Sequence, residues 1–175
     1  HSFHARRSSD LYRAKTFSEK FISEVKYIHD QNVWGAWVGG CWDIQSSTKD
    51  TLVKSQLNKL NEELWERIAG MSNPLRQQMI QFAKKCETNK NMDAVISIAK
   101  MFMKKRFNDF NTREYLFSCA NGLLDLKTGK LLDHDSKYLL TQTSRVEFNP
   151  EGTCNNFLSF LDDITNGDEK LKDYL

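Results

Sequence analysis

The stretch Tyr115–Leu132, YLFSCANGLLDLKTGKLL, decides the fold that we predict for this chain. Apolar residues lead up to Asn121-Gly122, resume after it, and turn again at Thr128-Gly129 before a final pair of leucines. Asn-Gly between apolar runs is the strongest short-range signal of a β-hairpin. We therefore predict short strands folded back on one another. The stretch holds no histidine, no nucleophile with a base and no phosphate-binding glycine pattern, so it indicates a scaffold rather than a reaction.

A second β-element is predicted over about residues 25–44, an N-terminal β-hairpin that turns at Gly39-Gly40. Trp37 and Trp42 flank this turn and are expected to pair across the strands. Trp34 lies three residues before Trp37, so it should face the other way and is the better candidate for exposure. Two interpretations of the tryptophans stay open: core residues of a small sheet, which we favour, and surfaces on which nucleic-acid bases stack.

Helical spacing dominates the region between the two β-elements. Apolar residues recur three or four positions apart from Val53 to Ile68, and the same spacing recurs in two further segments. We predict helices over about residues 48–106, forming a local bundle. Residues 115–175 are expected to hold the second β-element, with a β-leaning stretch at 138–148, and then short helices. The predicted fold class is α+β, with a mainly helical centre and two small antiparallel β-elements.

The domain organisation follows from length and composition. A chain of 175 residues fits one domain, which we place at 16–175, beginning with a short helix. Residues 1–15 are rich in arginine and lysine and are interpreted as a basic linker or a leftover of expression. The first residue is His1 rather than methionine, so we expect a fragment of something longer. No apolar run is long enough to cross a membrane and no signal peptide is visible, which predicts a soluble, cytoplasmic protein.

The distribution of charged residues, rather than the net charge, indicates what kind of ligand the chain contacts. The chain has 25 Lys and Arg against 23 Asp and Glu, and a net charge of +2 alone does not indicate nucleic acid. The strongest basic concentration in the body is Lys84, Lys85, Lys100, Lys104, Lys105 and Arg106. Part of it is explained by cations that complement the C-terminal ends of helices. The remainder predicts a surface that contacts phosphates, with a merely solvated face as the alternative.

Catalytic and metal-binding patterns are weak. Four scattered cysteines show no C-x-x-C pair, and no Walker A motif occurs, so we predict no metal site and no ATP site in this segment. Asp133-His134-Asp135 is the sequence feature behind one alternative, a metal-dependent nuclease or phosphoesterase. Adjacent residues in a loop rarely point at one ion, which argues against it.

The chain from Asn121 onward carries a longer pattern. It consists of a hairpin, a histidine, a threonine-containing strand, an aromatic residue before Asn-Pro, a cysteine, and Phe-Leu followed by an acidic stretch. The matching residues are Asn121, Gly122, Leu124, Asp125, Leu126, Thr128, Gly129, His134, Thr141, Phe148, Asn149, Pro150, Cys154, Phe160, Leu161 and Asp168. This pattern resembles the helicase-associated domain that precedes the superfamily 3 helicase core of phage, plasmid and poxvirus-type primase-helicases. The resemblance is looser over residues 17–120.

The resemblance implies a non-catalytic replication module between an upstream primase or polymerase and a downstream hexameric helicase. Its expected roles are ring assembly and the guidance of single-stranded or forked DNA. ATP and Mg²⁺ are expected only in the helicase core, beyond Leu175. The basic residues named above, with Trp34 as a possible stacking residue, are the contacts we expect from charge and aromatic character rather than from the family pattern. A pure oligomerisation or partner-docking module is the second alternative.

Overall fold

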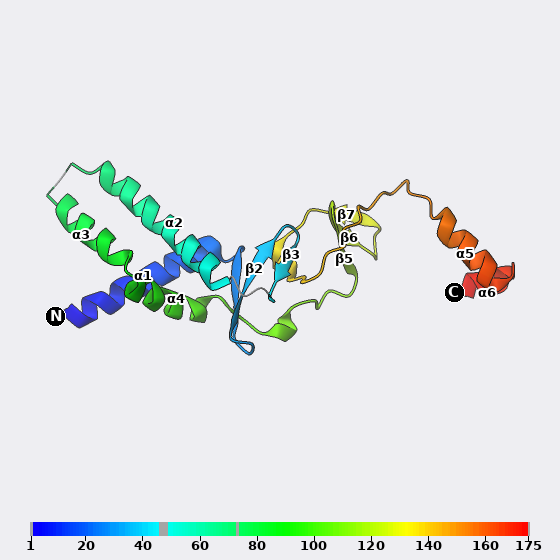
Figure 1. The fold of residues 1–175 in the computed structure, drawn as a ribbon, viewed down its shortest axis with the longest axis horizontal. Helices are drawn as coiled ribbons and strands as arrows, with labels where there is room; N and C mark the ends of the chain where they lie inside the picture. Colours follow the sequence, from blue (N-terminus) through cyan, green and yellow to red (C-terminus); the bar gives the residue numbers. More distant parts are fainter. Residues whose placement is uncertain (1, 46–48, 73, 175) are drawn as a thin grey trace.

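The structure is a computed structural model that describes residues 2–45, 49–72 and 74–174. Its elements in chain order are α1 (Ser2–Phe21), β1 (Val25–Ile28), β2 (Val33–Val38), β3 (Cys41–Asp43), α2 (Lys49–Ala69), α3 (Arg76–Cys86), α4 (Asn89–Phe102), β4 (Lys104–Lys105), the 3₁₀ turn η1 (Phe107–Asp109), β5 (Leu116–Cys119), β6 (Gly122–Asp125), β7 (Lys130–Leu132), the 3₁₀ turn η2 (Ser136–Tyr138), α5 (Asn155–Thr165) and α6 (Glu169–Tyr174). The predicted α+β class is confirmed. Figure 1 shows an elongated molecule with α1–α4 at one end, the two sheets in the middle and α5–α6 at the other end.

Helix α1 begins much earlier than the sequence suggests. Its buried face reaches back from Phe21 through Ser18 and Phe17 to Ala14, at spacings of three and four residues. The expectation that residues 1–15 form a linker is therefore corrected for residues 2–15, which belong to α1, and Ala14 among them lies on the buried face of the helix. The Ser18 hydroxyl donates to the Ala14 carbonyl oxygen at 2.7 Å, which satisfies a polar group inside this face.

The larger core lies between helices α1, α2 and α4 and one face of the first sheet. Phe17 and Phe21 from α1, Leu57 from α2 and Val95 from α4 are all buried there. Strands β1 and β2 close it from the sheet side, since Val25 and Tyr27 pair with Ala36 and Trp34. Helices α2, α3 and α4 lie within the range 48–106 in which helices were expected, its last residues are not helical, and residues 48 and 73 lie outside the described residues.

The first sheet has the strand order β3-β2-β1-β4. Strands β1, β2 and β3 are antiparallel, as predicted, and turn at Gly39-Gly40, where both residues have positive φ. Strand β4 joins β1 in parallel, so the prediction of helix as far as residue 106 is wrong. The cause is backbone pairing: the amide of Tyr27 donates to the Met103 carbonyl and the amide of His29 donates to the Lys105 carbonyl, both at 3.0 Å.

The second sheet, β5-β6-β7, is formed by the predicted hairpin stretch Tyr115–Leu132. Both pairings are antiparallel, with Cys119 opposite Gly122 and Asp125 opposite Lys130. A Cβ atom at Gly122 would lie 2.7 Å from the Leu132 carbonyl oxygen, so the backbones approach too closely there for a side chain. The prediction of short strands folded back on one another is confirmed.

The stretch at 138–148, predicted to be β-leaning, forms no strand. It starts in η2 and continues as irregular chain beside β5. Two separated backbone hydrogen bonds hold it: Ser144 N–H to the Ser118 carbonyl at 2.7 Å and Ala120 N–H to the Val146 carbonyl at 2.9 Å. A ladder needs regular alternation of such bonds, and these two flank a bend.

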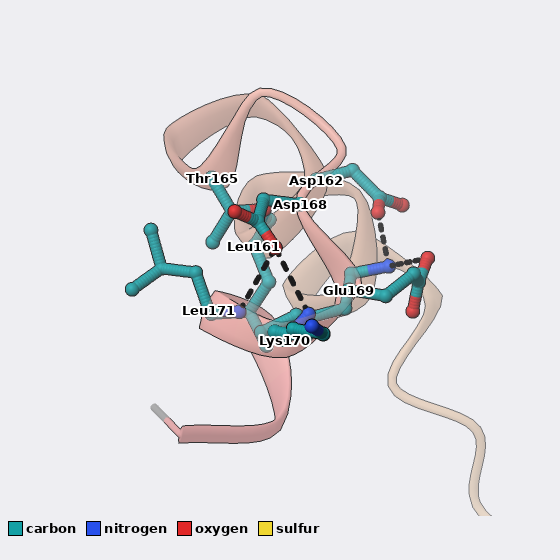
Figure 2. A network of polar contacts seen from close by, with 8 residues as sticks. Leu161, Asp162, Thr165, Asp168, Glu169, Lys170 and Leu171 are labelled. Carbon is teal, nitrogen blue, oxygen red and sulfur yellow. Dashed lines mark hydrogen bonds and ion pairs between the residues drawn. The ribbon is translucent and has the colours of Figure 1, made fainter.

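Helices α5 and α6 form a small unit of their own, apart from the other elements (Figure 1). Figure 2 shows the polar contacts that join them. Lys172 of α6 forms ion pairs with Asp162 of α5 and with Glu169 of its own helix. Asp168 caps α6, since its carboxylate accepts hydrogen bonds from the amides of Lys170 and Leu171 at 3.0 and 3.2 Å. Of these contacts, the ion pair between Lys172 and Asp162 joins the two helices.

The two sheets are joined by contacts around the β2–β3 turn. The Trp42 amide donates to the Leu140 carbonyl at 2.7 Å, and its indole N–H donates to the Ser136 carbonyl at 2.8 Å. Beside them the His134 ring lies against Gly40, where a Cβ atom would be 2.7 Å from Cε1 of the ring. Gly40 also has φ of +114°, which L residues rarely adopt.

We predict that Gly40→Ala lowers the free energy of unfolding by about 2–3 kcal/mol, because it adds backbone strain and displaces the His134 ring. Urea unfolding followed by tryptophan fluorescence measures the change. Gly39→Ala is the matched control: Gly39 has φ of +54° with nothing within 4 Å of a Cβ. Its cost should be about 1 kcal/mol. Equal losses in the two variants would show that the His134 contact contributes nothing.

Candidate nucleic-acid interface

The junction between α4 and β4 gathers four of the predicted cations, Lys100, Lys104, Lys105 and Arg106. Lys100 lies in the last turn of α4, where its charge complements the helix dipole. The buried Met103 then redirects the chain into β4. Lys104 and Arg106 are exposed, whereas Lys100 and Lys105 are partly buried. We call these four residues the basic junction.

The basic junction lies on both faces of the first sheet. Lys104 is paired with Tyr27, and Lys105 is paired with Ile28, so the two lysines point to opposite faces. On the first of these faces, the Lys100 ammonium lies 4.6 Å from the Tyr27 ring centroid. That distance is typical of a cation–π contact, which restrains the lysine without neutralising its charge.

Lys84 and Lys85 are not part of the basic junction. They lie exposed in the last turn of α3, and the whole of α4 separates them from Lys104. The 14 residues of α4 correspond to about 21 Å of helix. The structure therefore divides the six predicted cations into a pair and a group of four.

Trp34 occupies a position that the sequence analysis did not expect. Its side chain is only 3% exposed and packs in the larger core beside Tyr27, with 5.3 Å between ring centroids. The expectation of exposure is wrong because the face of the sheet opposite to Trp37 is covered by helices. The predicted cross-strand pairing of Trp37 with Trp42 is confirmed, with centroids 5.8 Å apart. Trp37 is the partly exposed tryptophan of β2.

Lys26 of β1 is a residue that sequence reasoning missed. Burial, together with the positive charge of Lys105, lowers the pKa of its ammonium to about 8. The ammonium lies 5.9 Å from the Trp42 ring centroid. The sequence signal that could have identified Lys26 is the alternation of side chains along β1. Val25 and Tyr27 face the larger core, so Lys26 lies on the face that carries Trp37.

Asp135 and His134, two residues of the nuclease or phosphoesterase alternative, make contacts that stabilise the fold. The Asp135 carboxylate accepts a hydrogen bond from the Lys137 amide and forms an ion pair with its ammonium at 2.7 Å. The Lys137 contacts lower the pKa of that carboxyl. The His134 ring packs on Gly40, as described above. Within residues 2–45, 49–72 and 74–174, no three His, Cys, Asp or Glu side chains are grouped so that they could hold a metal ion.

The described helices include none with the length and apolar character of a membrane-spanning segment.

The fold is an α+β domain in which a helical bundle and a small sheet meet at the basic junction. A family model described as "D5 N terminal like" matches residues 14–166. The chain belongs to this family, the N-terminal domain of D5-like primase-helicases, so the resemblance found in the sequence is confirmed. No curated protein sequence matches the chain closely enough to count as a relative.

The pKa of Lys26 gives a stability prediction. The folded chain holds this proton less tightly than the unfolded chain, whose lysine pKa is near the ordinary value of 10.5. Between pH 8 and 10.5 the unfolded state therefore binds more protons, so the Lys26 contribution to the free energy of unfolding rises with pH. Urea unfolding at pH 7, 8, 9 and 10 should show that the free energy of unfolding of the wild type increases relative to that of Lys26→Met across this window. A constant difference between the two proteins would contradict the lowered pKa.

Proposed function

We propose that the chain is a non-catalytic module of a viral or mobile-element primase-helicase, linking the primase or polymerase part to the hexameric helicase. In this proposal the module guides single-stranded or forked DNA and supports ring assembly, while ATP and Mg²⁺ act in the helicase core. Membership in the family of primase-helicase N-terminal domains supports the replication setting. The observation that carries the DNA part is the basic junction.

The chemistry of the basic junction suits the DNA backbone. Four cations lie within seven consecutive residues, and among the described residues none of them has a carboxylate within ion-pairing distance. Lysine and arginine side chains that neutralise phosphates release condensed counterions, so binding should weaken steeply as salt is added. Contacts of this kind position a strand without reading its sequence, which is what a guiding surface requires.

We predict that Lys104→Glu combined with Lys105→Glu weakens binding of a labelled oligothymidylate by at least tenfold at low salt. Removing two phosphate contacts should also reduce the slope of log K against log salt by about 1.4. Fluorescence anisotropy at several salt concentrations measures both quantities. Circular dichroism checks that the variant is folded.

The matched control is Lys84→Glu combined with Lys85→Glu, which makes the same charge change at the end of α3. If the basic junction is the interface, this control should retain most of the affinity and the salt slope of the wild type. Equal losses in the two double variants would indicate that net charge, rather than the basic junction, governs binding. Absence of oligothymidylate binding by the wild-type chain at low salt would refute the guiding role.

A pure oligomerisation module is the second candidate, and the exposed apolar face of α5–α6 favours it. Phe157, Phe160 and Ile164 are 53–58% exposed. The sheet β5-β6-β7 exposes Phe117, Leu131 and Leu132 in the same chain, and α5–α6 lies apart from it (Figure 1). Two apolar surfaces that do not cover each other within one chain suit contact between copies, so a second copy of this chain is the occupant that we propose.

We predict that Phe157→Gln combined with Phe160→Gln lowers the sedimentation coefficient measured at high protein concentration, because it removes apolar area from the contact between copies. Ser159→Gln is the control, since it changes an exposed position of the same helix without removing an aromatic ring. A wild-type chain that sediments as a monomer at every concentration would exclude self-association through this face.

A further inference from the structure

The pairing of β1 with β4 places two lysines from distant parts of the chain on one face of the first sheet. Ile28 is paired with Lys105, and Lys26 lies two residues before Ile28 on β1, so all three side chains share a face. Trp37 and Trp42 project from the same face, because their positions alternate with those of the core residues Trp34 and Ala36. Two cations therefore share one face of the sheet with two aromatic rings, and Lys26 contacts one of the rings, that of Trp42.

Lys26 shares with Lys100 and Lys105 the lack of a carboxylate within ion-pairing distance among the described residues, whereas the other partly buried lysines are paired. Lys54 and Lys172 form ion pairs with the carboxylates of Asp93 and Asp162 respectively. No carboxylate of the residues that the structure describes lies within ion-pairing distance of Lys26. Glu24, two residues before Lys26, accepts a hydrogen bond from the Gln56 side-chain amide at 2.6 Å. Asp30, four residues after Lys26, accepts from the Phe107 amide at 3.0 and 3.1 Å through its two oxygens.

The charges at this position are incompletely neutralised. Burial and Lys105 both lower the pKa of Lys26, which shows that its surroundings disfavour the ammonium. The Trp42 ring lies 5.9 Å away, near the outer limit of about 6 Å for a cation–π contact. An anion between the two ammonium groups would offset both the burial and the repulsion. A lysine kept unpaired at such a cost is typical of a binding site.

We propose that Lys26 and Lys105 together bind one backbone phosphate of single-stranded DNA, with Trp37 beside it as the surface on which a base stacks. This inference rests on the proposed DNA-guiding function and names the residues that would contact the DNA. Trp37 is partly exposed, and a partly exposed tryptophan next to cations is the arrangement by which single strands are held without sequence preference. The phosphate would be reached from the face opposite to Lys104.

The experiment combines NMR with DNA titration on the full 175-residue chain. The pKa of the Lys26 ammonium is measured by lysine side-chain NMR, first alone and then with inorganic phosphate or oligothymidylate. We expect a value near 8 without ligand and a rise of at least one unit with oligothymidylate, which purely structural burial would not produce. Lys26→Met and Lys105→Met should each reduce the salt slope of oligothymidylate binding by about 0.7. Trp37→Leu should weaken binding without changing that slope.

Lys59→Met is the matched control, because Lys59 is an exposed lysine of α2 far along the chain from this face. If oligothymidylate binds but Lys26→Met behaves like Lys59→Met and the Lys26 pKa does not move, the inference is overturned while the guiding function stands. If the wild-type chain binds no oligothymidylate, both are overturned. A pKa response to inorganic phosphate alone would then identify a phosphate site that serves another ligand.

Discussion

Trp42 is the residue on which the arrangement of the two sheets depends. Its side chain is 1% exposed, and both of its N–H groups donate to carbonyls of residues 136–140, nearly a hundred positions later in the chain. The rings of Trp37 and Phe110 contact its edges. The indole thus fills the space under the sheet and leaves no polar group unsatisfied, a combination that buried tryptophan requires.

Local chemistry explains which elements were predictable. The turns at Gly39-Gly40 and Asn121-Gly122 need conformations that few residues adopt, and the helices repeat an apolar stripe, so a short window of sequence suffices for each. Strand β4 was not predictable, since two lysines form a strand only because β1 offers carbonyl and amide groups beside them. Trp34 was misplaced for a related reason: alternation gives the two faces of a strand but not which face a helix covers.

The candidate site likewise contains residues that could be predicted from the sequence and residues that could not. Lys100–Arg106 could be recognised because the charges are contiguous in sequence. The pair Lys26 and Lys105 could not, because 79 positions separate them and only the parallel pairing of β1 with β4 brings them to one face. Lys84 and Lys85 were grouped with the others by composition, whereas the length of α4 holds them apart. Charge counts identify an electrostatic character, and strand pairing decides which charges act together.

The contact between His134 and Gly40 has a consequence for local unfolding. A fluctuation that opens the β2–β3 turn also releases His134 and the Ser118 hydroxyl, which donates to the Gly40 carbonyl at 3.3 Å. We therefore expect the first and second sheets to open together as one cooperative unit, although they share no strand. The helices α5 and α6 are held to each other by Lys172, and we expect this unit to open and close without disturbing either sheet.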